Sequence, residues 1–256
     1  MKKRFLLSLT AAITLCSMSA TAQNRVKNIY TETARLNMEQ VQNLEQTTQL
    51  NRYLMAGYNT LCLPTSLSAQ QLEAAGVTAE RLAAIRQEGS TLQLLFVDCT
   101  AEGLEAGVPY LICSQKTQYL RVKNTDAAHI ATELKTIRLS DGQGNQVAFS
   151  SSWEMRQKEG LYGIPAKQNT TPLESILVRT TGDLSFLPTR CGIAWEQQSS
   201  TADKLEIVHA NAAEVTAIQA VFGDNATQQE AYDLQGRKLN APIKGVNIIG
   251  GKKIIK

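Results

Sequence analysis

The hydrophobic positions of this chain fall in short runs from residue 47 onward, with turn-forming residues between them. The runs lie at 50–54, 58–64, 92–97, 109–113, 119–122, 137–139, 147–149, 176–180, 184–187, 191–195 and 205–209. Short apolar runs bounded by Gly, Pro, Asn, Asp and Ser are typical of strands. Their regular spacing predicts a mainly β fold, with an antiparallel β-sandwich-type domain, rather than alternating strands and helices.

Two of the turns predict hairpins. The segment 141–145 has the sequence Asp-Gly-Gln-Gly-Asn and separates two of the runs. Gly182 and Asp183 separate another two in the same way. Residues of these types favour the tight turns that join antiparallel neighbours. We therefore expect the runs on either side of each turn to pair with one another.

One stretch, residues 68–87, has the pattern of a short helical insertion. Ser68 and Gln71 match a capping box, in which the hydroxyl and the side-chain amide each satisfy a backbone N–H at the start of a helix. Gly76 interrupts the pattern. The sequence therefore predicts a helix that begins at Ser68 and breaks at this glycine.

Beyond the glycine the pattern predicts a second short helix. Thr78 stands where a capping residue would. Leu82 and Ile85 are three positions apart, which places them on one face of a helix. Gly89 is a natural stop.

The N-terminus has the three parts of a secretory signal peptide. Lys2, Lys3 and Arg4 are followed by an apolar run at 5–15, and then by Ala20-Thr21-Ala22. This small-x-small pattern predicts cleavage between Ala22 and Gln23. The apolar run is about half of the roughly 20 residues that a membrane span needs. Cleavage after residue 22 leaves 23 basic and 23 acidic residues, so there is no basic excess to favour nucleic acid or anionic membranes.

Four cysteines remain after the predicted cleavage, namely Cys62, Cys99, Cys113 and Cys191. An even number in an oxidising compartment allows up to two disulfides, in any of three pairings, and the alternative is free thiols packed in the core. The chain has no CxxC motif, and the two histidines are far from any cysteine in sequence. We therefore expect no structural zinc, no other metal and no cofactor.

No motif in the sequence predicts catalysis. There is no Gly-x-Ser-x-Gly, and no local signature supports pairing a cysteine with His129 or His209. Trp153 and Trp195 could form a small platform for a carbohydrate, or could be core tryptophans. Four glutamates could in principle serve a glycosidase, but nothing in their spacing singles them out: Glu102, Glu105, Glu154 and Glu159.

The C-terminal segment resembles the sorting tails of proteins exported by the type IX (Por) secretion system of Gram-negative bacteria. Such tails follow the pattern Y-D-L-x-G-R, a turn, and then K-G-[IV]-Y-I-x-x-G-K-K-[IV]-x-K. The matching residues are Tyr232, Asp233, Leu234, Gly236, Arg237, Lys244, Gly245, Val246, Ile248, Gly251, Lys252, Lys253, Ile254 and Lys256. Asn247 stands where the pattern has Tyr, and only the last part of a full-length tail is matched.

The resemblance implies passage across the outer membrane, with the outer-membrane secretion machinery as a partner. The tail also has a structural alternative, a terminal hairpin around Gly250-Gly251 whose lysines lie on a solvated edge. The middle of the chain resembles uncharacterised secreted β-rich proteins with the same tails, through Gly57–Pro64 (compare G-W-N-T-L-C-L-P-F) and Glu105–Ile112 (compare E-A-G-K-P-Y-L-I). This second resemblance implies a fold and a location but no active site.

Together these patterns predict four regions. They are a signal peptide at 1–22, a linker or leading strand at 23–46, a β-sandwich-type region at 47–221 and a sorting-like tail at 222–256. We expect a secreted or cell-surface protein, exported through the periplasm, with a noncatalytic binding, adhesive or structural role toward a surface glycan or protein. The alternative is a secreted hydrolase or a carbohydrate-binding accessory module.

Overall fold

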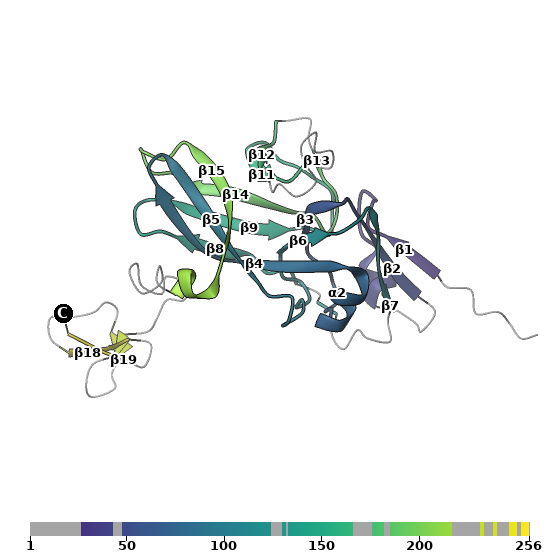
Figure 1. Ribbon diagram of the computed structural model, residues 1–256, viewed down its shortest axis with the longest axis horizontal. Coiled ribbons are helices and arrows are strands. Elements are labelled where there is room, and N and C mark those ends of the chain that lie inside the picture. Colours follow the sequence, from purple (N-terminus) through teal and green to yellow (C-terminus); the bar gives the residue numbers. More distant parts are fainter. Residues whose placement is uncertain are drawn as a thin grey trace, which may run out of the picture.

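The fold is known from a computed structural model that describes residues 27–42, 48–123, 130–131, 133–165, 176–181, 185–216, 231–232, 238–239, 246–249 and 252–255. The expectation of a mainly β fold is confirmed (Figure 1). The strands of the main body are β1 (Lys27–Tyr30), β2 (Thr48–Leu54), β3 (Gly57–Leu61), β4 (Val77–Glu88), β5 (Thr91–Asp98), β6 (Tyr110–Ser114), β7 (Gln118–Lys123), β8 (Ile137–Ser140), β9 (Gln146–Ser151), β10 (Arg156–Gln157), β11 (Leu161–Gly163), β12 (Val178–Arg179), β13 (Ser185–Phe186), β14 (Cys191–Gln197) and β15 (Lys204–Ala210).

These strands form three larger sheets and one small pair. The orders are β1-β2-β7, β15-β5-β4-β6-β3 and β12-β11-β14-β9-β8, and β10 pairs with β13. Most neighbours are antiparallel, as predicted, but β1 pairs in parallel with β2, and β15 with β5. A parallel pair needs a long crossover, and the strands of the second five-stranded sheet lie between β5 and β15 in the chain.

The two five-stranded sheets share one hydrophobic core. Phe96 on β5 and Phe149 on β9 meet edge to face in it, with ring centroids 5.8 Å apart. Ile193 on β14 and Leu111 on β6 are buried in the same core. Burial of these apolar side chains is the main favourable contribution to the stability of this arrangement. The designation as a sandwich stays a prediction.

Strands β3, β6 and β4 of the first five-stranded sheet also contribute, from their other face, to a second core. On that face they pack against the three-stranded sheet and against helix α2 (Ala69–Ala75), which lie beside one another in Figure 1. Leu50 on β2, Leu72 on α2 and Ile112 on β6 are each fully buried there. The β15-β5-β4-β6-β3 sheet is therefore the middle layer of the molecule.

The capping box predicted at the start of the helix is present. The backbone N–H of Gln71 donates to the Ser68 hydroxyl, and the backbone N–H of Ser68 donates to the Gln71 side chain at 2.7 Å. The helix ends at Gly76, whose φ of 64° is left-handed. Local sequence chemistry is enough to set both ends of α2.

The second helix predicted beyond Gly76 is wrong, because this segment is strand β4. Its pairing with β5 shifts register between Leu82 and Ala84, which is a β-bulge. The extra residue brings Leu82 and Ile85 to the same buried core, although residues three apart in a regular strand face opposite sides. The three-residue spacing therefore came from a bulge, and pairing with β5 and β6 on both sides of β4 determines the strand.

The two predicted hairpins have different outcomes. The runs on either side of 141–145 pair as β8 and β9, which confirms that hairpin. The runs on either side of Gly182 and Asp183 do not pair, since β12 pairs with β11 and β13 with β10. The second hairpin is therefore wrong, and residues 182–184 themselves lie outside the described residues. The tertiary partners outweigh the local turn signal here.

The N-terminal segment contains the leading strand β1 and a short helix, α1 (Met38–Gln42). In the tail the strands are β16 (Ala231–Tyr232), β17 (Lys238–Leu239), β18 (Val246–Ile249) and β19 (Lys252–Ile255), in the order β17-β16-β18-β19. The antiparallel pair β18–β19 confirms the terminal hairpin. Throughout the part of the chain that the structure describes, no helix combines the length and apolar character needed to cross a membrane.

Candidate functional site

The outer face of the three-stranded sheet is the most distinctive surface of the described chain. Along β2, Leu50 and Leu54 point into the core, so the residues between them point outward. The register of the three strands then fixes the members of this face. They are Asn28, Tyr30, Gln49, Asn51, Tyr53, Tyr119, Arg121 and Lys123, and we refer to them as the tyrosine face.

Three tyrosine rings form a continuous row on the tyrosine face. Tyr53 and Tyr119 are direct cross-strand partners, with ring centroids 5.2 Å apart. Tyr30 meets Tyr119 from the other side, at 5.7 Å and an interplanar angle of 74°. Tyr30 is 47% exposed and Tyr119 is 41% exposed. Edge-to-face contacts hold the rings in place while leaving ring surface open to solvent.

Side-chain amides form a hydrogen-bonded group beside the rings. Asn51 donates to the side-chain oxygen of Asn28 at 3.1 Å, and Gln49 donates to Asn51 at 2.7 Å. Asn51 is only 3% exposed, although it lies on the outward face. This network holds the three amide side chains in place, and those of Asn28 and Gln49 remain at the surface of the tyrosine face.

The charge on the tyrosine face has one sign. Arg121 and Lys123 are both exposed, and the eight outward residues of these three strands include no carboxylate. Aromatic rings, amides and cations together suit a ligand with stacking surfaces, hydroxyl groups and negative charge. The sequence signal for this face was an aromatic or polar residue at every second position, and it was missed because each strand contributes only two or three such residues.

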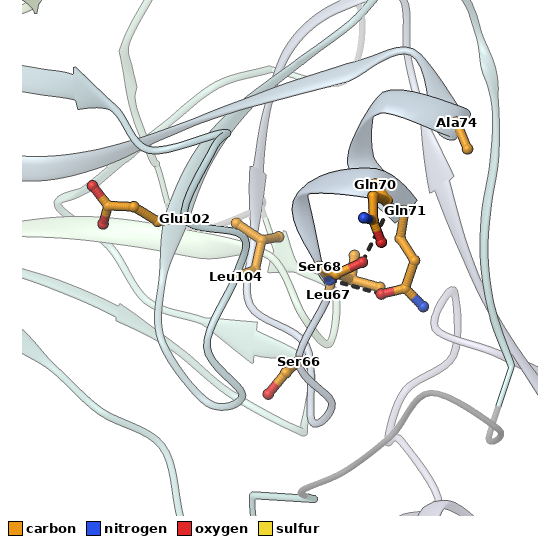
Figure 2. Close-up of a pocket in the computed structure, with 8 residues that line it drawn as sticks. All are labelled: Ser66, Leu67, Ser68, Gln70, Gln71, Ala74, Glu102 and Leu104. Carbon is orange, nitrogen blue, oxygen red and sulfur yellow. Dashed lines mark hydrogen bonds between the residues drawn. The ribbon is translucent and has the colours of Figure 1, made fainter.

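Two hollows flank α2. The first has a volume of about 580 Å³ and is lined by Ser66, Leu67, Ser68, Gln70, Gln71, Ala74, Glu102 and Leu104. Figure 2 shows Ser68 and Gln71 bonded to each other at the start of the helix, with Glu102 pointing away from them. Glu102 is paired with Arg81 at 2.6 Å. Glu102 is the one acidic residue among the eight that line this hollow. The hollow therefore lacks the two opposed carboxyl groups that glycoside hydrolysis needs.

The second hollow, of about 640 Å³, shares Glu102 with the first and is lined by residues of α2, of β4 and of the segment after β5. Glu73, Asp98 and Glu102 are among its lining residues, and Asp98 accepts a hydrogen bond from the backbone of Thr100. Among the residues that the structure describes, no cluster of three or more His, Cys, Asp or Glu is arranged to hold a metal ion. Neither hollow carries a recognisable reaction centre.

His209 is brought to a polar cluster on the middle sheet. Its Nδ1 lies 2.7 Å from a carboxylate oxygen of Glu80, and its ring stacks on Tyr58 with centroids 4.7 Å apart. Burial, followed by the Glu80 and Cys113 charges, raises the pKa of Tyr58 to about 12. Burial and Glu80 also raise the pKa of Cys113, which is the opposite of what activates a nucleophilic thiol. His129 lies outside the described residues.

The four cysteines are free thiols in the structure. Cys62, Cys99 and Cys191 are buried, and Cys113 is half-buried. Burial raises the pKa of Cys99 to about 11 and that of Cys191 to about 12. Thiols with raised pKa values are poorly reactive in the folded protein.

The two tryptophans are half-buried and used in packing. Trp195 packs against the core between the five-stranded sheets and meets Tyr162 edge to face at 6.4 Å. Trp153 packs against both large cores. The Nε1 atom of each is buried, so each indole has its polar end inside the protein. This is the packing role that the sequence left as the alternative to a ligand platform.

The remaining sequence candidates are dispersed. Glu105 pairs with Lys135, and Glu154 pairs with Arg35 at 3.1 Å, on separate parts of the surface. The predicted cleavage site at Ala22 and Gln23 lies outside the described residues. In the tail the backbones of six of the matching residues are described, namely Tyr232, Val246, Ile248, Lys252, Lys253 and Ile254. The other eight lie outside the described residues: Asp233, Leu234, Gly236, Arg237, Lys244, Gly245, Gly251 and Lys256.

The fold and these sites define a mainly β protein with an exposed aromatic face and no assembled catalytic group among its described residues. No model of a known protein family matches this chain, and neither a curated protein nor a solved structure matches it.

Proposed function

We propose that this chain is a noncatalytic binding protein that is exported to the cell surface and holds an anionic polysaccharide on its tyrosine face. The observation that carries the proposal is the row of Tyr30, Tyr53 and Tyr119, in which Tyr30 and Tyr119 are exposed to solvent, beside two cations. Sugar rings present C–H faces that stack on aromatic rings, and their hydroxyl groups bond to side-chain amides. An open sheet face suits an extended chain of sugars better than a small enclosed ligand.

Charge favours an anionic polysaccharide over a neutral one. Arg121 and Lys123 lie on β7 at the end of the tyrosine row, without a carboxylate among the outward residues of the three strands. A guanidinium binds a sugar carboxylate through two parallel hydrogen bonds. We therefore assign the uronic acid carboxylates of the polysaccharide to these two side chains.

Export is the second part of the proposal. Its support is the signal-peptide pattern that ends at Ala22 and the tail that resembles type IX sorting signals. The proposed partner of the tail is the outer-membrane secretion machinery. Deletion of residues 231–256 should abolish the appearance of the protein at the cell surface while leaving it in the periplasm. Unchanged surface display would refute the sorting role.

The binding test uses the chain from residue 23 onward with polygalacturonate, and with dextran as a neutral probe. We expect salt-sensitive binding to polygalacturonate and none to dextran. Replacing Tyr30 and Tyr119 together by Ala should weaken binding about tenfold or more, because each lost ring contact contributes about 1 kcal/mol. The matched double replacement by Phe keeps the rings and should retain most of the affinity.

Two further variants separate the contributions. Arg121→Gln with Lys123→Gln should weaken binding and reduce its salt dependence, since the surface charges are what salt screens. Met155→Ala, at a residue that is 42% exposed and does not belong to the three strands of the tyrosine face, should change nothing. Equal binding by the wild type and the Tyr-to-Ala variant, or tight binding to a protein ligand at another face, would overturn the proposal.

A further inference from the structure

Two of the four cysteines are buried in the core between the five-stranded sheets. Cys62 follows β3 directly and Cys191 begins β14, so they belong to different sheets and are far apart in the chain. Both are fully buried in the same core. Cys99 lies in the other large core, and its thiol donates to the carbonyl oxygen of Ala79.

Hydrogen bonds connect the backbone of each of these cysteines to a residue close in sequence to the other. The N–H of Cys62 donates to the carbonyl oxygen of Thr189 at 2.8 Å. The Thr60 hydroxyl accepts from the N–H of Cys191 at 2.9 Å and donates to its carbonyl oxygen at 3.1 Å. These three bonds bring the end of β3 against the start of β14.

A serine lies beside Cys191 in the neighbouring strand. Ser151 on β9 is the direct cross-strand partner of Cys191. Its hydroxyl donates to the carbonyl oxygen of Arg190, the residue before Cys191, at 2.9 Å. Burial raises the pKa of the Cys62 thiol, and the nearby Cys191 raises it further.

We infer that Cys62 and Cys191 are the cysteine pair that closes as a disulfide, joining the end of β3 to β14 across the core. The inference rests on the proposed export, because disulfides persist in oxidising compartments. It selects one of the pairings that the sequence leaves open. Cys99 and Cys113 remain thiols.

The chemistry is thiol–disulfide exchange with an external disulfide as oxidant. The thiolate of Cys62 attacks the external disulfide, forms a mixed disulfide and releases one thiolate. The thiolate of Cys191 then attacks the Cys62 sulfur and releases the second thiolate, so two protein thiols are oxidised and one external disulfide is reduced. Since the thiolate is the reacting form and burial disfavours it, closure takes place during folding, before the core excludes the oxidant.

The bond would constrain the unfolded chain strongly, because Cys62 and Cys191 are 129 positions apart in the chain. A loop of this length gives a large reduction of the entropy of the unfolded state. Reduction of the disulfide should therefore lower the melting temperature by about 10 °C.

The test begins with the chain from residue 23 onward, refolded from the reduced state with oxidised and reduced glutathione. Peptide mapping without reductant should recover one cross-linked peptide pair that contains Cys62 and Cys191. Cys62→Ser and Cys191→Ser should each remove the effect of reductant on the melting temperature. Cys99→Ser and Cys113→Ser are matched controls that should keep it.

A failure of this inference can be told apart from a failure of the proposed export. Refolding in vitro tests only whether the fold allows Cys62 and Cys191 to form the bond. Peptide mapping of protein recovered from the periplasm tests whether the bond forms in that compartment. The peptide map of the wild type decides the matter even when a serine variant fails to fold. Four alkylatable thiols after refolding, or a cross-link to Cys99 or Cys113, would overturn the inference.

Discussion

Tyr53 and Tyr119 face each other across β2 and β7, with ring centroids 5.2 Å apart. Tyr53 is half-buried, whereas Tyr119 is 41% exposed and also contacts Tyr30. A cross-strand aromatic pair of this kind holds two strands together and presents one ring to solvent. The same contact thus serves both the stability of the sheet and the proposed binding face.

This pair should show measurable energetic coupling. In a double-mutant cycle with Tyr53→Ala and Tyr119→Ala, we expect a coupling of about 0.5–1.5 kcal/mol in the free energy of unfolding. The measurement is urea denaturation of the four proteins. A parallel cycle with Tyr53 and Met155, which lies outside the three-stranded sheet, provides the baseline and should give no coupling. Additive losses in both cycles would contradict the role of the ring contact.

The buried cation Arg52 should make Glu32 important for stability. Arg52 is 1% exposed on the inner face of β2, and its guanidinium lies 3.3 Å from the Glu32 carboxylate. Burial, and then the nearby Arg190, lower the pKa of Arg52 to about 10, which reflects the cost of desolvating its charge. Replacing Glu32 by Ala leaves that charge without its carboxylate. We expect a loss of about 3–5 kcal/mol in the free energy of unfolding.

Two controls accompany this prediction. Arg52→Met removes the buried charge together with its need for a partner, so it should cost less than Glu32→Ala. Arg81→Met breaks the exposed pair with Glu102 and should cost less than about 1 kcal/mol. Urea denaturation of all three variants gives the comparison, and equal losses for Glu32→Ala and Arg81→Met would count against the prediction.

The loop beside the first hollow should depend on Gly103. Its φ is +80°, and a Cβ atom there would lie 2.4 Å from the carbonyl oxygen of Leu67. Gly103→Ala should therefore cost more than about 3 kcal/mol, because it combines an unfavourable φ with a backbone clash. Gly89 has a φ of +60° and open space around it, so Gly89→Ala isolates the φ effect at about 1 kcal/mol. Thermal unfolding distinguishes the two, and similar losses would exclude the clash.

Stability should fall at high pH partly through Tyr58. Its ordinary pKa is 10.0, and the folded protein raises this to about 12, first through burial and then through Glu80. As pH rises from 10 toward 12, the unfolded chain loses the phenol proton while the folded chain keeps it. The free energy of unfolding therefore decreases over that window. Tyr58→Phe keeps the ring that stacks on His209 but cannot ionise, so its decrease should be shallower. Urea denaturation at several pH values measures this, and identical slopes would contradict it.

The sequence by itself determined the features that depend on neighbouring residues. The capping box of Ser68 and Gln71, the left-handed end of α2 at Gly76 and the β8–β9 hairpin are each set within a few positions. The short apolar runs with turn-forming residues between them also determined that the fold is mainly β. These features follow from hydrogen bonds and backbone preferences that act locally.

Only the tertiary structure decided which strands are neighbours. The bulge between Leu82 and Ala84 arises from pairing with β5, and it gives a strand the spacing of a helix. The tyrosine face exists because β1, β2 and β7 lie side by side, although β7 follows β2 by more than sixty positions. The same holds for Cys62 and Cys191, which are buried in one core because β3 and β14 belong to sheets that share it. Contacts of this kind depend on the free energy of burying whole sheet faces, which no local pattern encodes.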